Sequence, residues 1–507
     1  MTFLELLYGA EVLSQSGNPG IGGLEYDSRR IKPGDAFVAM RGESSDGNKF
    51  IDQAIAAGAV AIVSDSASEK PCPAVAWAQV PHGRRALARL SANFYKKPAE
   101  RLAITGITGT NGKSTTAFLL ESILTAAGRN GALIGTIEYH VAGKTLPAPH
   151  TTPEALELNR ILNQALGTGA TEIVMEVSSH ALEQQRVYGI PFDVAVFTNL
   201  TRDHLDYHRT MEEYFSSKEI LFKGSGTEAP HAAVLNLDDE YGQKLVKISR
   251  KHSAEVVTYG LTTGDFHVER VSITPRGTRF DLITPKSTIP LFSPLIGKVN
   301  VYNILAAAGA ACARNCAPES IAQGVAALAR VPGRFEPVDC QQPFTVVVDY
   351  AHTDDALRNL TALAREFVQQ AGRKGKVVTV FGCGGDRDRA KRPLMGEAAG
   401  RGSDFVILTS DNPRREDPLA IINDAMVGLQ RSGARYKTEP DRKAAIAMAV
   451  REANPGDIVL IAGKGHEKVQ INREGSVPFD DVEVARKVLR DAGYDCKSSN
   501  AAAGRRV

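Results

Sequence analysis

A glycine-rich segment between a predicted strand and a predicted helix has residue types suited to binding phosphate. It follows the apolar run at 102–108 and consists of Gly109, Thr110, Asn111, Gly112, Lys113, Ser114 and Thr115. Backbone N–H groups at a helix start point at a bound phosphate, the lysine adds positive charge, and the serine hydroxyl can bind Mg²⁺. The strict G-x-x-x-x-G-K-[ST] pattern would begin at Ile107, so this is a variant phosphate loop. It predicts ATP binding, with a turn carrying a solvated lysine as the structural alternative.

Other candidate ligands lie near the ends of later apolar runs. Glu176 ends the run at 171–177, and ligands of α/β sheets bind at the carboxyl ends of parallel strands. We therefore expect Glu176 beside the phosphate loop, where Mg²⁺ needs an oxygen ligand; a structural strand-end carboxylate is the alternative. Farther on, Asp203-His204-x-Asp206-x-His208 spaces two histidines for one helix face. That spacing also suits zinc, although a third ligand and the general-base glutamate of zinc proteases are absent.

Short β-branched runs alternate with Ala- and Leu-rich stretches through most of the chain, which indicates the α/β class with parallel sheets and helical crossovers. The stretch 254–292, which opens with EVVTYG at 255–260, predicts an antiparallel appendage of short strands. Elsewhere, strands are predicted at 34–40, 59–65, 102–108, 171–177, 193–198, 232–236, 344–350, 376–382, 404–410 and 457–463, and helices at 50–59, 82–95, 113–127 and 300–313.

Two breaks divide the chain into three domains, at Lys96-Lys97-Pro98 and at 330–333 (RVPG). The last dozen residues lack periodicity and are predicted to form a flexible tail. The expected parts are a smaller N-terminal α/β domain, a central P-loop parallel-sheet ATPase domain, a C-terminal Rossmann-like domain and the tail, over 1–98, 99–331, 332–495 and 496–507.

Composition narrows the class of protein. The 507 residues contain 60 Lys+Arg and 58 Asp+Glu, a formal charge of +2, so no overall field attracts nucleic acid or anionic membrane. No apolar run approaches the roughly 20 residues of a membrane span, and the start MTFLELLYGAEVL has no basic region. We expect a cytoplasmic monomer that binds small molecules, without a nucleic-acid partner or membrane insertion.

The cysteines are scattered over the chain without metal-ligand spacing, which does not suit a disulfide framework and favours a reducing compartment. Cys312 and Cys316 lie in an Ala-rich helical run and are interpreted as small buried thiols. The full set is Cys72, Cys312, Cys316, Cys340, Cys383 and Cys496.

Ordered motifs over nearly the whole chain resemble the Mur ligase family, most closely its members that add the third residue of the peptidoglycan stem peptide. The resemblance extends from about Tyr26 to about Glu467. The motifs are TGTNGKST (108–115), HTTPEA (150–155), EVSSHALEQQRV (176–187), TNLTRDHLDYHRTMEEY (198–214), NVYNILAA (300–307), VPGRFE (331–336), DYAHT (349–353) and SDNPRREDP (410–418).

The resemblance implies an ATP-dependent amide ligase with Mg²⁺ as cofactor and ATP as co-substrate. Its other substrates would be UDP-MurNAc-L-Ala-D-Glu, whose D-Glu carboxylate is activated as an acyl phosphate, and meso-diaminopimelate. Lys113, His204 and Lys218 are implied as catalytic, with Lys218 carbamylated to N6-carboxylysine. From the residue alone, Lys218 would be a solvated helix lysine.

The resemblance also assigns binding residues, each an ordinary polar or loop residue when taken alone. Glu43 and Ser44 depart from the His-Gln of some members, which leaves uracil contacts there open. Mg²⁺ is assigned Ser114, Glu176, His204 and Lys218. Beyond the phosphate loop, ATP is assigned Asn303, Arg334, Asp349 and His352. The nucleotide dipeptide is assigned Ser28, Thr151, Thr152, Ser178, Gln184 and Arg186. Diaminopimelate is assigned Arg392, Asp411, Asn412, Pro413, Arg414, Gly463 and Glu467.

Three alternatives remain at this point. A lysine-adding ligase would share the chemistry but lack the Arg414 guanidinium that pairs with the distal carboxylate of diaminopimelate. A folylpolyglutamate synthetase-like ligase would lack the uridine-binding N-terminal domain. A non-ligase P-loop NTPase or kinase would hydrolyse or transfer phosphate without forming an amide.

Overall fold

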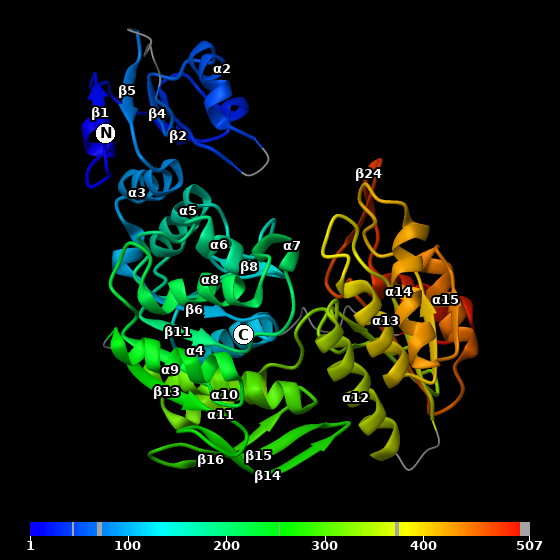
Figure 1. Ribbon diagram of the computed structural model, residues 1–507. Helices are drawn as coiled ribbons and strands as arrows, with labels where there is room; N and C mark the ends of the chain where they lie inside the picture. The colour runs from blue at the N-terminus through cyan, green and yellow to red at the C-terminus, as the bar shows by residue number, and fades with distance from the viewer. Residues whose placement is uncertain (43–44, 68–73, 253, 371–374, 497–507) are drawn as a thin grey trace.

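The computed structural model describes residues 1–42, 45–67, 74–252, 254–370 and 375–496. Three units follow one another along the chain, each built around its own sheet (Figure 1). The α/β class and the three-part architecture are confirmed. Glu43 and Ser44, where uracil contacts were left open, lie outside the described residues.

The N-terminal unit is a five-stranded sheet in the order β1-β5-β4-β3-β2, parallel except for β1. Both β3 and β4 are buried along their length, as expected for inner strands of a parallel sheet. The strands are β1 (Ser14–Ser16), β2 (Gly23–Glu25), β3 (Asp35–Ala39), β4 (Ala61–Ser64) and β5 (Ala76–Gln79). The helices are α1 (Phe3–Leu6), α2 (Ile51–Ala56) and α3 (Gly83–Phe94), with 3-10 turns η1 (Ser28–Arg30), η2 (Gly47–Phe50) and η3 (Pro98–Arg101).

The central unit contains an eight-stranded sheet in the order β13-β12-β11-β6-β10-β7-β8-β9. Its first six strands are parallel, and β8 and β9 continue it as an antiparallel meander. The strands are β6 (Ala103–Thr108), β7 (Gly131–Ile134), β8 (Glu138–Val141), β9 (Lys144–Pro147), β10 (Glu172–Glu176), β11 (Val194–Phe197), β12 (Ala232–Asn236) and β13 (Glu255–Tyr259). Because β6 lies between β10 and β11, the strand order reverses at β6, and a ligand site is expected at its carboxyl end.

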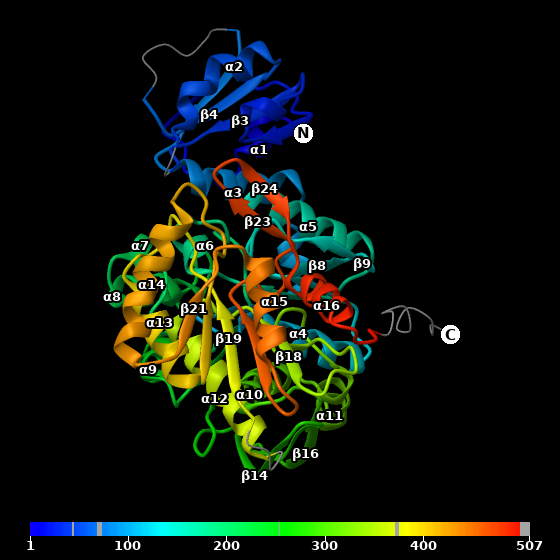
Figure 2. The ribbon, with the colours of Figure 1, turned by 90° about the vertical axis from the view of Figure 1, so that its right-hand side faces the viewer.

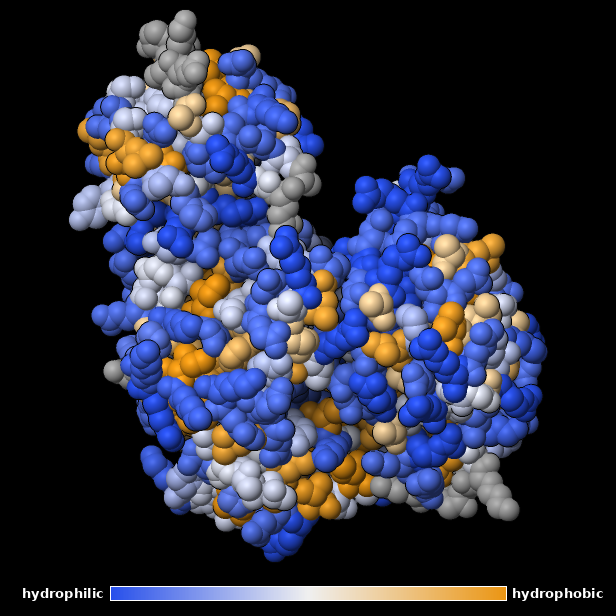
Figure 3. All heavy atoms as spheres, viewed as in Figure 1, coloured by the Kyte–Doolittle hydropathy of each residue, from blue (hydrophilic) through white to orange (hydrophobic). Residues whose placement is uncertain are grey.

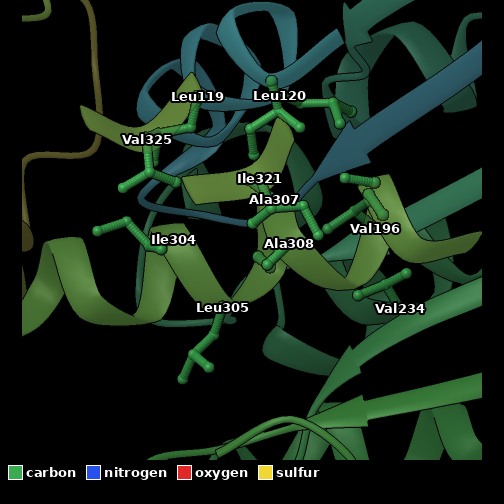
Figure 4. Close-up of a cluster of buried hydrophobic side chains, with 14 of the residues drawn as sticks. Leu119, Leu120, Val196, Val234, Ile304, Leu305, Ala307, Ala308, Ile321 and Val325 are labelled. Carbon is green, nitrogen blue, oxygen red and sulfur yellow. The ribbon is translucent and has the colours of Figure 1, made fainter. Parts of the chain in front are cut away.

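Helices cover both faces of this sheet. On one face α4, α10 and α11 form an apolar layer (Figure 4), where Leu120, Ile304 and Ile321 are fully buried. The small residues of α10 let it approach the sheet, and Gly324 of α11 lies so close to α4 that an added Cβ would be 2.4 Å from the Ile123 Cα. The helices of the unit are α4 (Lys113–Ala126), α5 (Ala155–Gly167), α6 (Ser179–Glu183), α7 (Leu205–His208), α8 (Met211–Lys223), α9 (Glu240–Lys251), α10 (Lys298–Ala313) and α11 (Pro318–Ala327).

The appendage is smaller than predicted. Strands β14 (His267–Thr274), β15 (Gly277–Ile283) and β16 (Thr288–Ser293) form an antiparallel three-stranded sheet. The expectation that 255–260 belongs to it is wrong, because β13 pairs in parallel with β12 at the edge of the central sheet. A short apolar run looks the same in either sheet, so the strand with which it pairs decides to which sheet it belongs.

The C-terminal unit is a six-stranded sheet in the order β17-β18-β22-β19-β20-β21, parallel except for β17. Helices α12, α13 and α14 cover one face, and α15 and α16 cover the other (Figure 2). The strands are β17 (Glu336–Pro337), β18 (Thr345–Asp349), β19 (Val377–Phe381), β20 (Phe405–Leu408), β21 (Tyr436–Thr438) and β22 (Ile458–Ala462). The helices are α12 (Asp354–Gln370), α13 (Lys391–Gly402), α14 (Pro418–Ser432), α15 (Arg442–Glu452) and α16 (Asp481–Asp491).

A separate hairpin of β23 (Val469–Asn472) and β24 (Gly475–Pro478) projects from the C-terminal unit. Figure 1 shows β24 rising toward the level of the N-terminal unit, and Figure 3 shows an open notch between the two. Strand β23 is attached to the loop after β20, since Arg414 N donates to Ile471 O over 3.0 Å.

The cysteine prediction needs a correction. Cys340 and Cys496 form a disulfide that joins the region before β18 to the segment after α16. Cys496, the first residue of the predicted tail, takes part in this bond, and 497–507 lie outside the described residues. Cys312, Cys316 and Cys383 are free thiols, with Cys316 and Cys383 buried and Cys312 partly so. Cys72 lies outside the described residues.

Within the described ranges, the structure contains no helix with both the length and the apolar character needed to span a membrane.

A histidine between two carboxylates ties β8 to the phosphate-loop helix. His140 Nδ1 lies 2.7 Å from Glu121 Oε1 of α4, and its Nε2 lies 2.9 Å from Glu138 Oε1. Hydrogen bonds to Glu121 and Glu138 raise the pKa of His140 to about 9, against the opposing effect of burial. The imidazolium is thus the folded-state form at neutral pH, and it holds the antiparallel end of the sheet against α4.

This contact predicts a pH-dependent stability. Because the folded-state pKa of His140 is raised above the unfolded value, its stabilisation is complete below about pH 6.5 and is lost as pH rises through about 9. His140→Gln should lower the free energy of unfolding by about 1–2 kcal/mol at pH 7 and by nearly nothing at pH 10. Thermal melts of both proteins across this range give the measurement. A difference that stays constant from pH 7 to pH 10 would contradict the assignment.

Candidate active site

The phosphate loop occupies residues 109–112, between β6 and α4, as predicted. Gly112 has a left-handed φ of 88°, and an added Cβ there would lie 2.4 Å from the Asn303 Oδ1. Lys113 opens α4, and its Nζ donates to the carbonyls of Gly109 (3.0 Å) and Thr110 (2.8 Å). Burial lowers the pKa of Lys113. The loop's own carbonyls thus hold a partly buried lysine at the helix start, where phosphate oxygens bind in other proteins.

The loop is anchored from several directions. Thr110 Oγ1 donates to the Thr201 carbonyl and lies 3.1 Å from the Tyr214 hydroxyl. Asn111 Nδ2 donates over 3.0 Å to Asp355 Oδ2, which belongs to the C-terminal unit. Two units therefore hold the loop.

Glu176 lies at the carboxyl end of β10, opposite Ile107 of β6, as predicted. Its carboxylate accepts from the Thr136 N–H at 2.7 Å and from the Thr136 hydroxyl at 2.9 Å. Its charge acts on Lys113, whose pKa it raises against burial. A nearly fully buried oxygen ligand therefore stands beside the loop.

Asp203 joins the central and C-terminal units. Its Oδ1 lies 3.3 Å from Lys391 Nζ, and its Oδ2 lies 3.7 Å from His352 Nε2 and 3.5 Å from His204 Nε2. Burial alone would raise the pKa of Asp203, but its neighbours His204 and Lys391, with the His352 hydrogen bond, hold that pKa well below its usual range. Burial lowers the pKa of His204 to about 3, so its imidazole is neutral. A neutral imidazole can act as a metal ligand.

Lys218 of α8 is almost completely buried beneath the loop. Its Nζ donates over 3.0 Å to the Gly109 carbonyl and lies 4.6 Å from the centre of the Tyr214 ring. Burial, reinforced by the nearby charge of Lys113, holds the pKa of Lys218 well below its usual value. The expectation of a solvated helix lysine is wrong, and the side chain is a buried amine that is readily neutral.

The zinc alternative has no support. His208 lies inside the protein with Nε2 2.9 Å from Ser179 Oγ and Nδ1 3.2 Å from Ser217 Oγ, so both nitrogens are occupied. Among the described residues, no group of three or more His, Cys, Asp and Glu is arranged to hold a metal ion.

The remaining residues predicted to bind ATP differ in whether they contact the phosphate loop and its helix. Arg334 Nη2 donates over 3.2 Å to Ser114 Oγ, so the segment that links the two units reaches the helix start. Asp349 accepts from the Phe335 N–H at 2.6 Å and the Ala351 N–H at 2.8 Å. Its carboxylate therefore organises this corner of the backbone. Thr115 is buried on α4.

Five of the predicted dipeptide-binding residues form one cluster next to Glu176. Thr152 Oγ1 donates to the Glu176 carbonyl and accepts from the Ser178 N–H, and Thr151 Oγ1 accepts from Thr136. Arg186 Nη2 donates over 2.7 Å to Gln184 Oε1, and Arg186 Nη1 donates to the Thr152 carbonyl. Ser28 is separate, in the N-terminal unit, where its hydroxyl donates to Gln53 Oε1.

The predicted amino-acid pocket lies at the carboxyl ends of β20 and β22. Asn412 Nδ2 donates to Glu467 Oε2 at 2.7 Å, and fully buried Lys464 donates to both side chains, over 3.0 and 2.8 Å. Gly463 has a φ of 116°, and an added Cβ would lie 2.5 Å from Asp411 Oδ2. Close backbone approach thus requires glycine there.

Two arginines without carboxylate partners of their own border this pocket in the described structure. Arg414 Nη1 donates to the Gly385 carbonyl over 2.8 Å, and Arg387 Nη1 donates to the Asp386 carbonyl. Burial lowers the pKa of Arg414, and the nearby charge of Arg387 lowers it further. Two guanidinium groups in one place favour an anionic ligand.

Arg392 differs from these two. It is fully buried, and its guanidinium donates to Glu416 at 2.7 and 3.0 Å and to Asp424 at 2.9 Å. Glu416 also accepts from the Asp386 N–H. Arg392 thus joins the loop after β19 to the loop after β20.

The sequence interpretation missed several functional candidates. They are Asp203 as a contact between two units, Arg387, Lys391 and Lys464. Arg387 and Lys391 lie in the charged segment GGDRDRAKRP (384–393), whose density of charge after a strand was a usable signal. Arg442, fully buried and paired with Asp481 at 2.7 Å, had no local signal.

Comparison with known families covers most of the chain. Family models for the Mur ligase family, catalytic domain, for the Mur ligase middle domain and for the Mur ligase, glutamate ligase domain match residues 20–95, 107–311 and 333–465.

Proteins of similar sequence match this chain over nearly its full length. A UDP-N-acetylmuramoyl-L-alanyl-D-glutamate--2,6-diaminopimelate ligase of Solibacter usitatus is 54% identical, covering 93% of this chain and 94% of the relative. One of the same name from Geobacillus thermodenitrificans is 45% identical, covering 94% and 96%.

Solved structures share the fold. A structure with the same ligase name is 34% identical with a TM-score of 0.67, covering 97% of this chain and 99% of that one. The folylpolyglutamate synthase of Mycobacterium tuberculosis shares the fold alone, at 18% identity and a TM-score of 0.62, over 82% of this chain and 96% of that one. With its three units, each built around its own sheet, its phosphate loop and these matches, the chain belongs to the Mur ligase family.

Proposed function

We propose that this protein is an ATP-dependent ligase that joins meso-diaminopimelate to the D-Glu side-chain carboxylate of UDP-MurNAc-L-Ala-D-Glu. The observation that carries the proposal is the near-full-length identity to ligases of that name. The geometry supports it, because the phosphate loop and the pocket bordered by guanidinium groups belong to two units that are in contact through Asp203 and Lys391, among other pairs.

In the first step, a carboxylate oxygen of D-Glu attacks the γ-phosphorus of ATP, the bond to the β-phosphate oxygen breaks, and ADP leaves. Lys113 exchanges the Gly109 and Thr110 carbonyls for phosphate oxygens and neutralises charge as the phosphoryl group moves. Asn303, in contact range of Gly112, and Arg334, bonded to Ser114, would bind the nucleotide from the other side of the loop.

The residues present fit Mg²⁺. Ser114 and Glu176 supply hard oxygen ligands beside the loop, and His204 supplies a neutral nitrogen nearby. Because Mg²⁺ in ATP sites is held by one or two protein ligands with phosphates and water, a closed protein cage is not required. When bound, the ion would neutralise charge on the phosphates.

We propose that Lys218 carries a carbamate. Its neutral amine would add to CO₂ with loss of one proton, replacing a positive group by a carboxylate beneath the loop. The burial that depresses its pKa also makes the amine a nucleophile, and the product would offer oxygens to a second Mg²⁺.

For the nucleotide substrate, the cluster of Thr151, Thr152, Ser178, Gln184 and Arg186 lies next to Glu176 and provides hydroxyl, amide and guanidinium donors. Ser28 in the N-terminal unit would bind the uridine end. These two regions belong to different units, which suits a long substrate whose nucleotide and peptide ends are far apart.

The incoming amino acid would bind in the C-terminal pocket. Arg414 would pair its guanidinium with the distal carboxylate, and Glu467 would receive the distal ammonium. Arg387 extends the same positive border. Arg392 would act indirectly, by holding Glu416 and hence the Arg414 loop, because its own donors face protein carboxylates.

In the second step, the amine nitrogen attacks the acyl carbon through a tetrahedral intermediate. The C–O bond to phosphate then breaks, and hydrogen phosphate leaves with the proton that the amine gives up. Positioning of the two substrates supplies much of the rate.

The proposal predicts that phosphate release requires both co-substrates. Wild-type enzyme should release phosphate from ATP and form amide only with the uridine dipeptide and meso-diaminopimelate together. Lys113→Ala should lower the rate by about 100-fold or more, because charge on the transferring phosphoryl group is no longer neutralised. Lys144→Ala, an exposed change on β9, is the control. Rapid ATP turnover without either co-substrate would indicate a non-ligase NTPase.

Specificity for the distal carboxylate should depend on Arg414. A charge-assisted pair is worth about 1.5–3 kcal/mol, so wild-type enzyme should prefer meso-diaminopimelate to lysine by about 10- to 150-fold in kcat/KM. Arg414→Ala should narrow that ratio and raise the KM for diaminopimelate more than that for ATP. Arg415→Ala, an exposed change at the next residue, should leave the ratio as it is. Equal use of both amino acids by wild type would instead favour a lysine-adding enzyme.

Carbamylation of Lys218 should be visible directly. Wild-type enzyme in ¹³C-bicarbonate should show a carbamate carbon signal that Lys218→Ala lacks. That variant should lose about 100-fold or more in kcat, since Lys218→Ala removes the oxygens expected to bind metal. Lys223→Ala, at the exposed end of the same helix, is the matched control. A fully active Lys218→Ala enzyme would refute this role.

A further inference from the structure

We propose that Lys391 is a further catalytic residue, a cation that the C-terminal unit contributes to the phosphoryl-transfer site. The inference rests on the ligase function proposed above and adds a group that acts on the reacting phosphate. Neither the phosphate-loop motif nor the pocket motif includes it.

The position of Lys391 places it between the two half-sites. It is the first residue of α13 and follows the loop whose Arg387 borders the amino-acid pocket. Its Nζ reaches out of the C-terminal unit to Asp203 Oδ1 of the central unit, 3.3 Å away. Asp203 immediately precedes His204 and acts electrostatically on both Lys113 and Lys218. Lys391 is thus in the region where amine and acyl phosphate must meet.

Burial makes a purely structural role costly. Lys391 is only 7% exposed, and a buried ammonium loses hydration that one carboxylate replaces incompletely. In the part of the chain that the structure describes, the hydrogen bond to Asp203 is the one that Nζ makes, although an ammonium has three donors. The other donors can serve a ligand.

Cationic side chains approach this region from different parts of the chain. Lys113 lies at the phosphate loop, Arg334 reaches Ser114 from the segment that links the two units, and Lys391 comes from the C-terminal unit. The buried carboxylate of Asp203 is also approached by His204 and His352. Cations that approach one place from several directions are suited to a polyphosphate and to the phosphate of an acyl phosphate.

A second buried lysine, Lys464, differs from Lys391 in its hydrogen-bond partners. Lys464 donates to both Asn412 Oδ1 and Glu467 Oε2, inside the amino-acid pocket, and therefore has a positioning role toward those two side chains. Within the described residues, Lys391 has one hydrogen-bond partner, Asp203, which lies across the interface in the central unit.

In the reaction, the Lys391 ammonium would pair with oxygens of the γ-phosphoryl group as it moves from ADP to the D-Glu carboxylate, and again as phosphate leaves the acyl carbon. Lys391 neither gives up nor takes a proton in either step, so the proton balance of the two steps is unchanged. Its effect is electrostatic stabilisation of the transition state.

The test compares Lys391→Met with Lys391→Arg. For each, kcat and the KM of all three substrates are measured, together with exchange of ¹⁸O between the β,γ-bridge and β-nonbridge positions of ATP, with the uridine dipeptide present and the amino acid absent. This exchange reports acyl-phosphate formation alone. Lys391→Met should lower kcat and the exchange rate by about 100-fold or more, with the KM for diaminopimelate changed less than about threefold. Lys391→Arg, which keeps the charge and the pair with Asp203, should recover at least a tenth of both rates.

Two matched lysine changes complete the design. Lys464→Met should raise the KM for diaminopimelate, and Lys437→Met, at an exposed pair with Glu452, should behave as wild type. If Lys391→Met keeps kcat and isotope exchange within threefold of wild type, or if Lys391→Arg is as impaired as Lys391→Met, the proposal is overturned. Failure of the proposed ligase function would appear separately, because wild-type enzyme would then form no amide with diaminopimelate. In that case the isotope-exchange rates of Lys391→Met and wild type are compared with whichever carboxylate substrate wild-type enzyme does phosphorylate.

Discussion

The carboxyl ends of two parallel sheets face each other across one buried carboxylate, and the site depends on that contact. Asp203, after β11, holds Lys391 and approaches His352, both from the C-terminal unit. Asn111 and Ser114 reinforce it through Asp355 and Arg334. Without this interface, the phosphate loop and the amino-acid pocket would be separate sites, each with half of the chemistry.

Features encoded within a few residues could be predicted from the sequence. The strand, glycine-rich turn and helix around Lys113 are such a local signal, and the strand-end position of Glu176 follows from one apolar run. The edge strand β13 could not be assigned in this way, because its parallel pairing with β12 depends on the tertiary arrangement. The Cys340–Cys496 disulfide spans 156 positions and leaves no trace in cysteine spacing.

At the site, residue identity was easier to predict than side-chain direction. Arg392 and Arg414 belong to charged segments of similar appearance, yet Arg392 faces Glu416 and Asp424 inside the unit and Arg414 borders the pocket. Lys218 resembles a surface lysine in its helix and is almost completely buried. Lys391 and Asp203 are 188 residues apart, so their contact depends on how the units pack.

The buried pair of Arg442 and Asp481 has a consequence for how this enzyme can change. Arg442 also donates to the carbonyls of Ser410 and Ala462, at the ends of β20 and β22, from beneath the pocket. Removing either charge would leave the other unpaired in the interior, so neither position tolerates single replacement. On the loop above, the Arg414 side chain donates to the carbonyls of Gly385 and Asn412, away from this pair. Selection for a different amino-acid substrate can therefore act on Arg414 while the sheet beneath stays intact, so substrate specificity can change without loss of stability.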